Sequence, residues 1–296
     1  MPSPIRPRRS ALYMPGANSR ALEKARGLDA DGLIFDLEDA VAPDAKAAAR
    51  AAVVAAVSMG GYGERELLVR VNALGTKWGE DDLAAVSRLA IDGVLLPKVE
   101  SADAVRQVEA MLDARGAGDR LAIWCMIETP LGVLRVAEIA AASKRIGGLV
   151  MGTSDLANDL RARQTADRMP LLTSLGLCLL AARAFDLPIL DGVHLDLADD
   201  AGFARSCLQG RELGFDGKTL IHPKTIAAAN AAFAPSPEDV AWSRRIIAAH
   251  DAAMREGKGV VLVDGKLVEN LHVADARRLA ALATAIEKRA ISAAPR

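Results

Sequence analysis

Short apolar runs alternate with longer stretches of helical spacing eight times between residues 11 and 233. An unbroken apolar run is typical of a strand buried on both faces, which occurs in parallel sheets covered by helices. Eight such units predict a (β/α)8 TIM barrel over residues 1–233. A doubly wound open sheet is the alternative, but no G-x-G-x-x-G segment opens a helix. The predicted strands lie within residues 11–16, 32–39, 66–72, 93–101, 121–130, 147–155, 187–196 and 216–223.

The intervening stretches predict helices, with Asn18 and Ser101 as N-caps of two of them. A single helix is expected over 132–143, and a long loop is expected to lead from strand six to a helix at 170–185. After Phe233 a turn-rich linker leads into a C-terminal extension, residues 234–296. This extension predicts a helix, a hairpin turning at Asp264-Gly265 and a last helix. We expect it to act as a lid, as an arm for oligomer assembly, or as both.

Composition excludes several classes of partner. A net charge of −1 provides no strong field for nucleic acid or an anionic membrane. The apolar run 171–185 is shorter than the roughly 20 residues that span a bilayer. Three widely spaced cysteines within apolar runs predict reduced core residues, which suits a cytoplasmic protein. Prolines at positions 2, 4 and 7 argue against an N-terminal signal peptide.

Charged residues follow nearly every predicted strand, where a barrel of this kind carries its chemistry. Glu128 closes strand five and Asp155 closes strand six, so their carboxylates can converge. Two convergent carboxylates either share a proton or bind a hard cation. Two protein oxygens with room left for water and substrate is the usual way in which Mg²⁺ is held. The alternative is that both carboxylates form ion pairs with Arg70 and Lys98.

Arg70, at the end of strand three, is the natural partner for an anionic group of a substrate, because its planar fork suits a carboxylate. Its alternative role is that of a structural counter-ion to the acidic segment 36–39, D-L-E-D. The small residues before Asp155 form a segment that can offer backbone N–H groups to an anion or oxyanion.

Several segments together resemble the HpcH/HpaI aldolase and citrate lyase β-subunit family, in particular the malyl-CoA and citramalyl-CoA lyase-like proteins. The likeness extends from Arg9 to the hairpin near Gly265. It rests on PGANSRALEKA, IFDLEDAVAPDAKAAAR, VRVN, LLPKVES, ETPLGV, GTSDLA and IHPKTI. The resemblance implies a Mg²⁺-dependent barrel enzyme that assembles as a homotrimer or hexamer and takes an acyl-CoA thioester and a small 2-keto acid.

The resemblance also implies roles for individual residues. Glu128 and Asp155 would ligate the metal, Glu38 and Asp39 would order water around it, and Arg70 would contact the acid substrate. Further substrate contacts would come from Tyr13, Arg20, Lys24, Ser154, Ile221 and His222. Lyases of this family commonly carry an acid/base aspartate in the C-terminal hairpin, where this chain places Glu269. Glu269 is thus expected to be catalytic; the alternative is an exposed hairpin residue.

The expected reaction is cleavage or formation of a 3-hydroxyacyl-CoA, yielding acyl-CoA plus glyoxylate or pyruvate. Hydrolysis of the thioester on the same site is one alternative. A class II aldolase acting on free hydroxy-keto acids is another, although such enzymes generally rely on a barrel histidine that the early strands lack. A third is the β subunit of a citrate lyase complex, which would be inert alone.

Overall fold

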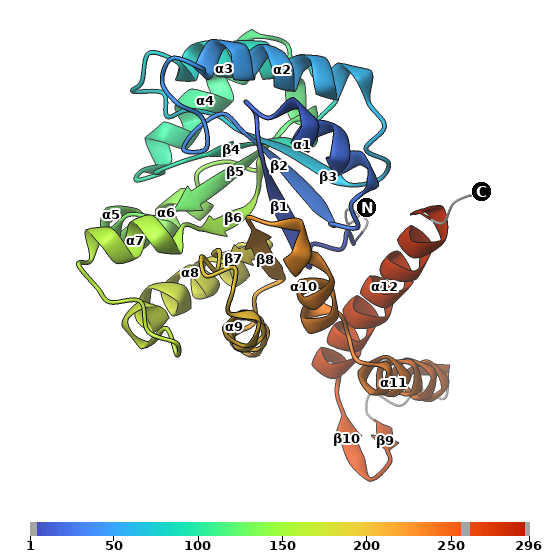
Figure 1. Cartoon of the computed structure of the whole chain (residues 1–296). Coiled ribbons are helices and arrows are strands. Elements are labelled where there is room, and N and C mark those ends of the chain that lie inside the picture. The colour runs from blue at the N-terminus through green and yellow to red at the C-terminus, as the bar shows by residue number, and fades with distance from the viewer. Residues whose placement is uncertain (1–4, 256–260, 294–296) are drawn as a thin grey trace. The chain divides into compact units, whose positions relative to one another are not determined.

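The computed structural model describes residues 5–255 and 261–293. Its centre is a closed barrel of parallel strands in sequence order, in which the first strand pairs with the eighth (Figure 1). The predicted (β/α)8 barrel is therefore confirmed. The strands are β1 (Ser10–Pro15), β2 (Gly32–Asp36), β3 (Glu66–Arg70), β4 (Gly93–Leu96), β5 (Ala122–Ile127), β6 (Ile146–Met151), β7 (Ile189–Asp191) and β8 (Gly217–Leu220).

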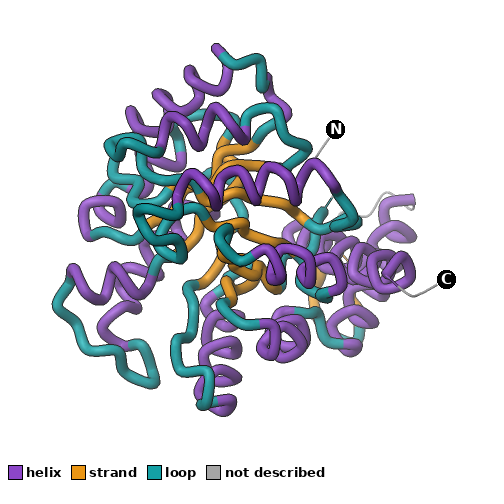
Figure 2. Tube along the Cα trace, turned by 45° about the horizontal axis from the view of Figure 1, so that its top comes forward, coloured by secondary structure: helices purple, strands orange, loops and turns teal. Residues whose placement is uncertain are grey.

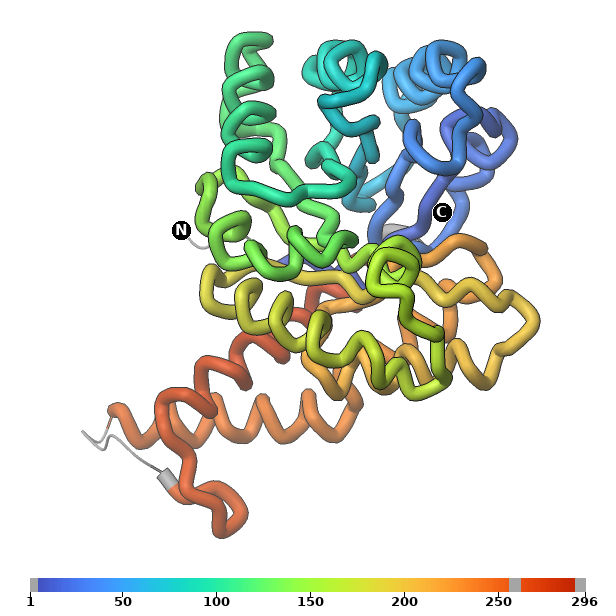
Figure 3. The backbone as a smooth tube through the Cα atoms, turned by 90° about the vertical axis from the view of Figure 1, so that its left-hand side faces the viewer, coloured from blue at the N-terminus to red at the C-terminus, as the bar shows by residue number. Residues whose placement is uncertain are grey.

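Helices surround these strands, as the purple segments around the orange ones in Figure 2 show. Figure 3 follows this ring along the chain from blue to yellow. The helices are α1 (Ser19–Lys24), α2 (Lys46–Met59), α3 (Gly79–Val86), α4 (Ala102–Ala114), α5 (Pro130–Leu134), α6 (Val136–Ala140), α7 (Thr153–Asp159), α8 (Leu172–Ala184), α9 (Asp200–Leu213) and α10 (Ile226–Phe233). Short 3₁₀ turns are η1 (Ala25–Gly27), η2 (Gly118–Arg120), η3 (Met169–Leu171) and η4 (Pro223–Thr225).

The apolar side chains form two layers, because successive residues of a strand point to opposite faces. One large layer lies between the strands and the helices, and it includes Cys125, Cys178 and Cys207 as buried free thiols. A smaller layer fills the barrel around Trp124. Gly148 on the neighbouring strand makes room for that ring, since a Cβ there would lie 2.5 Å from it.

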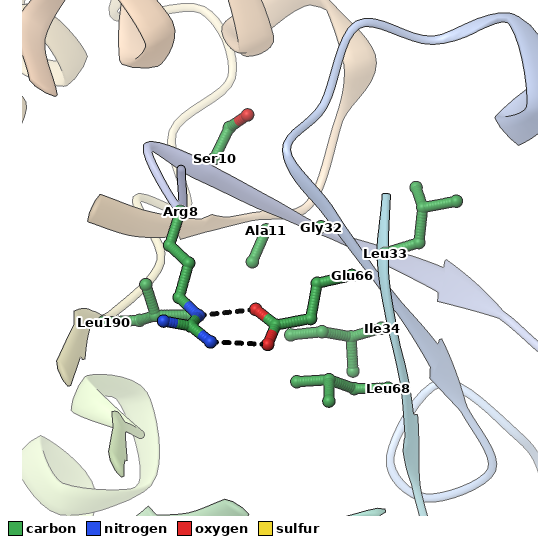
Figure 4. Close-up of a pocket in the computed structure, with 9 residues that line it drawn as sticks. All are labelled: Arg8, Ser10, Ala11, Gly32, Leu33, Ile34, Glu66, Leu68 and Leu190. Atoms are coloured by element: carbon green, nitrogen blue, oxygen red, sulfur yellow. Dashed lines mark hydrogen bonds and ion pairs between the residues drawn. The ribbon is translucent and has the colours of Figure 1, made fainter. Parts of the chain in front are cut away.

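The lower end of the barrel, where the strands begin, is closed by ion pairs. Arg8 donates two hydrogen bonds to Glu66, of 2.6 and 2.7 Å, across a small cavity of about 10 Å³ (Figure 4). Its guanidinium also lies over the Trp124 ring at 5.3 Å. Arg9 pairs with the buried Asp31 at 2.8 Å. These contacts tie the chain ahead of β1 to the starts of β2 and β3.

Two details differ from the sequence prediction. The helix expected over 132–143 is split into α5 and α6, because Arg135 has a non-helical backbone conformation. The long loop expected after strand six begins instead with helix α7, which buries Leu156 and Ala157 in the outer layer. The predicted N-caps are confirmed: the side chains of Asn18 and Ser101 accept the N–H groups of Ala21 and Ala104.

The contacts within the chain divide it into two compact units, one of them Arg8–Phe233. The other holds α11 (Pro237–Arg255), the antiparallel strands β9 (Val261–Val263) and β10 (Lys266–Val268), and α12 (Asn270–Ala293) (Figures 1 and 3). The predicted hairpin turn is confirmed, since Asp264 and Gly265 both have positive φ, of 47° and 77°. Roles as a lid or an oligomer arm stay predictions. Within the described ranges, no helix has the length and apolar character to cross a membrane.

Candidate functional site

A cavity of about 380 Å³ opens at the end of the barrel where the strands finish. Seven of the residues predicted from the sequence line it, namely Tyr13, Asp39, Arg70, Glu128, Ser154, Asp155 and Ile221. The lining also contains residues that the sequence analysis did not select, among them Asp36, Met126, Val193, Leu195 and Thr219. The rim of the barrel thus gathers side chains from most of its strands into one pocket.

Glu128 stands directly after β5 and is almost fully buried. The chain turns there because Thr129 caps α5, accepting the Gly132 N–H, and Pro130 begins the helix. The Oε1 atom of Glu128 accepts the backbone N–H of Lys98 at 2.8 Å. Gly152 leaves space for Oε2, since a Cβ there would lie 2.4 Å from that oxygen.

Asp155 lies in the first turn of α7, with its carboxylate part-exposed toward the pocket. Burial, together with the negative charge of Asp155, raises the pKa of Glu128 to about 7. Both residues line the same pocket, where the charge of Asp155 acts on Glu128 in addition to burial. The sequence prediction that Glu128 and Asp155 converge at the rim therefore agrees with their placement, while their role as metal ligands stays a prediction.

Arg70 is held by Asp36 through a bidentate pair. Its Nε and Nη2 atoms donate to the two Asp36 oxygens at 2.7 and 2.6 Å. The remaining nitrogen, Nη1, lies 3.0 Å from Glu38 and 3.5 Å from Asp39, and the guanidinium lies 4.8 Å from the centre of the Tyr13 ring. All three guanidinium nitrogens therefore face carboxylates of the segment 36–39, as the predicted alternative of a structural counter-ion has it, and Nη1 is the nitrogen outside the bidentate pair.

The pairing of Arg70 with Asp36 follows from strand register. Asp36 ends β2, Arg70 ends β3, and the two residues are register partners in the parallel pair. The sequence analysis placed Asp36 at a strand end but did not select it for the site. The register of the two predicted strands, obtained by counting residues along them, would have identified Asp36 as the neighbour of Arg70.

Asp36 and Lys46 hold the backbone of the acidic segment after β2 in place through hydrogen bonds. Asp36 accepts the backbone N–H groups of Glu38 and Ala40 at 2.9 and 3.2 Å. The buried Lys46 ammonium donates to the carbonyl oxygens of Leu37 and Glu38 at 2.8 and 2.7 Å. Burial raises the pKa of Glu38, and Asp39 reaches the pocket with a more exposed carboxylate.

Lys98, just after β4, connects three of these carboxylates. Its Nζ atom lies 3.3 Å from Asp155 and 3.6 Å from Glu38, and its backbone N–H binds Glu128. The predicted alternative was that Glu128 and Asp155 both form ion pairs with Arg70 and Lys98. Of the two, only Asp155 forms such a pair, with Lys98. Glu128 receives a backbone hydrogen bond instead.

Five predicted residues lie outside the pocket lining, and Glu38 is the one among them that is joined to the lining residue Arg70 by an ion pair. Arg20 and Lys24 have exposed side chains on α1, which follows β1. His222 is exposed and its Nδ1 atom accepts the Lys224 N–H at the start of η4. Glu269 has an exposed side chain just ahead of α12, in the other compact unit.

The pocket carries an excess of negative charge. Four carboxylates, those of Asp36, Asp39, Glu128 and Asp155, line it with one cationic side chain, Arg70. Glu38 and Lys98 adjoin this group through ion pairs with Arg70 and Asp155. Among the described residues, no group of three or more His, Cys, Asp or Glu side chains forms a ready-made metal cage. Two carboxylate ligands beside open space suit Mg²⁺, which keeps several waters and is reluctant to enter an all-protein cage.

Comparisons with known proteins agree on the relationship of this chain. A family model described as HpcH/HpaI aldolase/citrate lyase matches residues 9–223. A protein named (3S)-malyl-CoA thioesterase from Cereibacter sphaeroides is 50% identical over 280 residues, 95% of this chain and 96% of the relative. The citrate lyase subunit beta of Escherichia coli is 39% identical over 269 residues, 89% of each chain.

Among solved structures, the protein CitE from Mycobacterium tuberculosis matches with a TM-score of 0.74 and 32% identity. The match covers 96% of this chain and 100% of that chain. That crystal structure is a complex with magnesium, acetoacetate and coenzyme A.

Proposed function

The chain belongs to the HpcH/HpaI aldolase/citrate lyase family, and from that premise we propose that it is a Mg²⁺-dependent enzyme that hydrolyses a malyl-CoA-type 3-hydroxyacyl-CoA thioester. The observation that carries the proposal is the pair of convergent carboxylates, Glu128 and Asp155, beside a 380 Å³ cavity with excess negative charge. The relative named (3S)-malyl-CoA thioesterase supports the choice of hydrolysis, because half of its residues are shared over nearly the whole chain.

In this proposal Glu128 and Asp155 hold the metal directly. The donor set fits, since Glu128 has one oxygen bound by a backbone N–H while Gly152 keeps space around the other. Glu38 and Asp39 act on the metal through water. When bound, Mg²⁺ would supply Lewis-acid polarisation of a substrate oxygen.

The protein's own groups orient the substrate and move its protons. The Nη1 atom of Arg70 binds the distal carboxylate of the substrate, and the backbone N–H groups of Ser154 and Asp155 face the acid portion. Glu38 accepts a proton from the attacking water, because its raised pKa makes it a better base near neutral pH than an ordinary carboxylate. The water oxygen then bonds to the thioester carbon, the C–S bond breaks with its electron pair on sulfur, and Glu38 returns the proton to that sulfur, so that the CoA thiol and the free acid are released.

The thioester arm is proposed to leave across the rim near α1. Arg20 and Lys24 carry exposed positive charges there, which suit the phosphates of coenzyme A. Leu195 and Ile221 line the pocket with half-exposed apolar surface that suits the pantetheine portion. Tyr13 lies deeper, stacked on Arg70, and His222 supports the Ile221 segment by capping η4.

Carbon–carbon cleavage is the second candidate, supported by the relationship to citrate lyase subunit beta. A base would remove the hydroxyl proton of the substrate, the Cα–Cβ bond would break, and the electron pair would pass to an acyl-CoA enolate. Glu269 would then protonate the enolate carbon if the hairpin serves a catalytic site. A free-acid aldolase lacks such support, since the described residues that line the pocket include no histidine.

One assay separates the two candidates. The purified full-length protein is incubated with (3S)-malyl-CoA and Mg²⁺, while free thiol and glyoxylate are measured in parallel. Hydrolysis yields one thiol per substrate and no glyoxylate, whereas cleavage yields glyoxylate and acetyl-CoA with no free thiol. Neither product from the lone chain would favour a subunit that needs a partner complex, and turnover that persists in EDTA would refute the metal assignment.

Assembly as a homotrimer or hexamer in the cytoplasm remains part of the proposal. Light scattering of the purified chain, with and without Mg²⁺, tests the subunit number. A monomer that is fully active would remove the expected need for a hairpin from a neighbouring subunit.

A further inference from the structure

Lys98 has a backbone conformation that an ordinary side chain rarely adopts. Its φ is 50°, in the left-handed region, although lysine has a Cβ that disfavours it. This conformation directs its N–H to Glu128 at 2.8 Å, across 30 positions of the sequence. Such strain persists only where surrounding contacts over-determine it, and it gathers at functional sites.

The side chain of the same residue returns to the same group of carboxylates. Its ammonium lies 3.3 Å from Asp155 and 3.6 Å from Glu38, and 45% of the side chain is exposed. One residue therefore holds Glu128 through its backbone and Asp155 through its charge. The ammonium is thus held beside Asp155, a residue that lines the pocket, while much of the lysine side chain stays exposed.

We propose that the Lys98 ammonium is an internal counter-ion that holds Asp155 in the metal-free site and is displaced when Mg²⁺ binds. The inference rests on the proposed function and deepens it by naming a residue that regulates metal binding. A metal ion on Asp155 would lie next to the ammonium that contacts its Oδ2 atom, and two cations at such short range repel each other.

The displacement requires no movement of the backbone. The N–H bond to Glu128 keeps the main chain of Lys98 in place, while its flexible stem lets the ammonium move from Asp155 toward Glu38, which it already approaches. Lys98 then remains beside the acidic segment and continues to offset its charge. In the metal-free protein it limits the repulsion between the carboxylates; in the metal-bound protein its charge lowers the affinity for Mg²⁺.

The test is the dissociation constant for Mg²⁺, measured by isothermal titration calorimetry on the full chain without substrate. Lys98→Met keeps the length of the stem and removes the charge, so we expect Mg²⁺ to bind about 10-fold more tightly. Lys98→Arg keeps the charge and should stay within about 2-fold of the parent protein. Lys144→Met is the matched control, because it removes an exposed lysine just ahead of β6, at the opposite end of the barrel.

The outcomes separate this inference from the proposed function. Equal or weaker binding by Lys98→Met, with clear binding by the parent protein, would overturn the displacement alone and assign Lys98 to the support of the metal site. No binding by either protein would overturn both. Tightening in Lys144→Met of the same size as in Lys98→Met would also overturn it, since only net charge would then matter. Lys98→Gln supplies a second neutral variant if Lys98→Met does not fold.

Discussion

The two ends of the barrel use charge in opposite ways. Where the strands begin, arginines meet buried carboxylates in close pairs, Arg9 with Asp31 and Arg8 with Glu66, the second pair beside a cavity of about 10 Å³. Where the strands finish, four carboxylates and one arginine line a cavity of about 380 Å³. Burial raises the pKa of Glu128 and of Glu38 at that end.

This difference separates charge that maintains the fold from charge that serves a ligand. At the lower end each carboxylate is paired with an arginine, so removal of that arginine weakens the compensation of a buried charge. At the upper end carboxylates outnumber cationic side chains, and repulsion among them lowers the stability of the metal-free protein. Under the proposed function, a bound cation would supply at the upper end the positive charge that arginines supply at the lower end.

The largest effect is expected on turnover, from substitutions at the upper end of the barrel, where the strands finish. Glu128→Gln and Asp155→Asn should each lower Mg²⁺-dependent turnover about 1,000-fold or more, because each removes an anionic ligand without changing side-chain size. Initial rates with malyl-CoA measure this, and circular dichroism checks the fold. Glu66→Gln at the lower end is the control and should keep kcat; loss of kcat by Glu66→Gln equal to that of Glu128→Gln would remove the distinction between the ends.

Arg70→Lys should lower kcat/KM about 100-fold, because an ammonium cannot form the bidentate pair with Asp36. Without that pair, the positive charge is no longer held in the position that Nη1 occupies. Steady-state kinetics over a range of substrate concentrations measures the change. A near-normal kcat/KM, accompanied by a lower melting temperature, would make Arg70 a structural counter-ion like the arginines of the lower end.

At the lower end the expected effect is on stability. Arg8→Met should lower the free energy of unfolding by about 2–4 kcal/mol, because it removes the bidentate ion pair that the part-buried arginine makes with the buried Glu66 carboxylate. Denaturant titration of the parent and the variant measures the loss, and kcat of the folded fraction should be unchanged. A neutral effect on stability would mean that the pair contributes no more than a surface ion pair.

The smallest effect is an increase in the free energy of unfolding, from a substitution at Glu128. Glu128 has a folded-state pKa of about 7 against an ordinary value of 4.5, so the folded protein binds a proton that the unfolded chain has lost between these values. Its contribution to stability is therefore largest at low pH and is lost as the pH rises from 4.5 through 7. Glu128→Gln should stabilise the metal-free protein at pH 8 by about 1–3 kcal/mol.

Unfolding of the metal-free parent and of Glu128→Gln at pH 5 and pH 8 measures that difference. The gain should be small at the lower pH and larger at the higher. A variant less stable than the parent at pH 8 would show that the Glu128 carboxylate is stabilised by its surroundings, as the carboxylates of the lower end are.

The sequence predicted the barrel and much of the pocket for one physical reason. Parallel strands place all their carboxyl ends on one rim, so Arg70, Glu128 and Asp155 had to come together once the strands were found. The apolar lining, such as Met126, was missed because an inward-facing apolar residue has the same signature whether it packs or lines a cavity.

Contacts that depend on strand register and backbone conformation were not predicted from the sequence. The segment D-L-E-D offers three carboxylates, and only strand register decides that Asp36 takes the fork of Arg70. The left-handed conformation of Lys98 has no local signal, because it depends on a hydrogen bond to a residue one strand away. The residues predicted from the family resemblance divide between the two outcomes: Tyr13 and Ile221 line the pocket, whereas Arg20 and Lys24 lie outside its lining.

The most direct test of the account is a crystal structure of the protein soaked with Mn²⁺, whose anomalous signal locates an ion that accepts the same oxygen ligands as Mg²⁺. We predict one strong anomalous peak within about 2.3 Å of a carboxylate oxygen of Glu128 and of Asp155, with Lys98 turned toward Glu38. A pocket without a peak at saturating Mn²⁺, or a peak that these two carboxylates do not reach, would contradict the account.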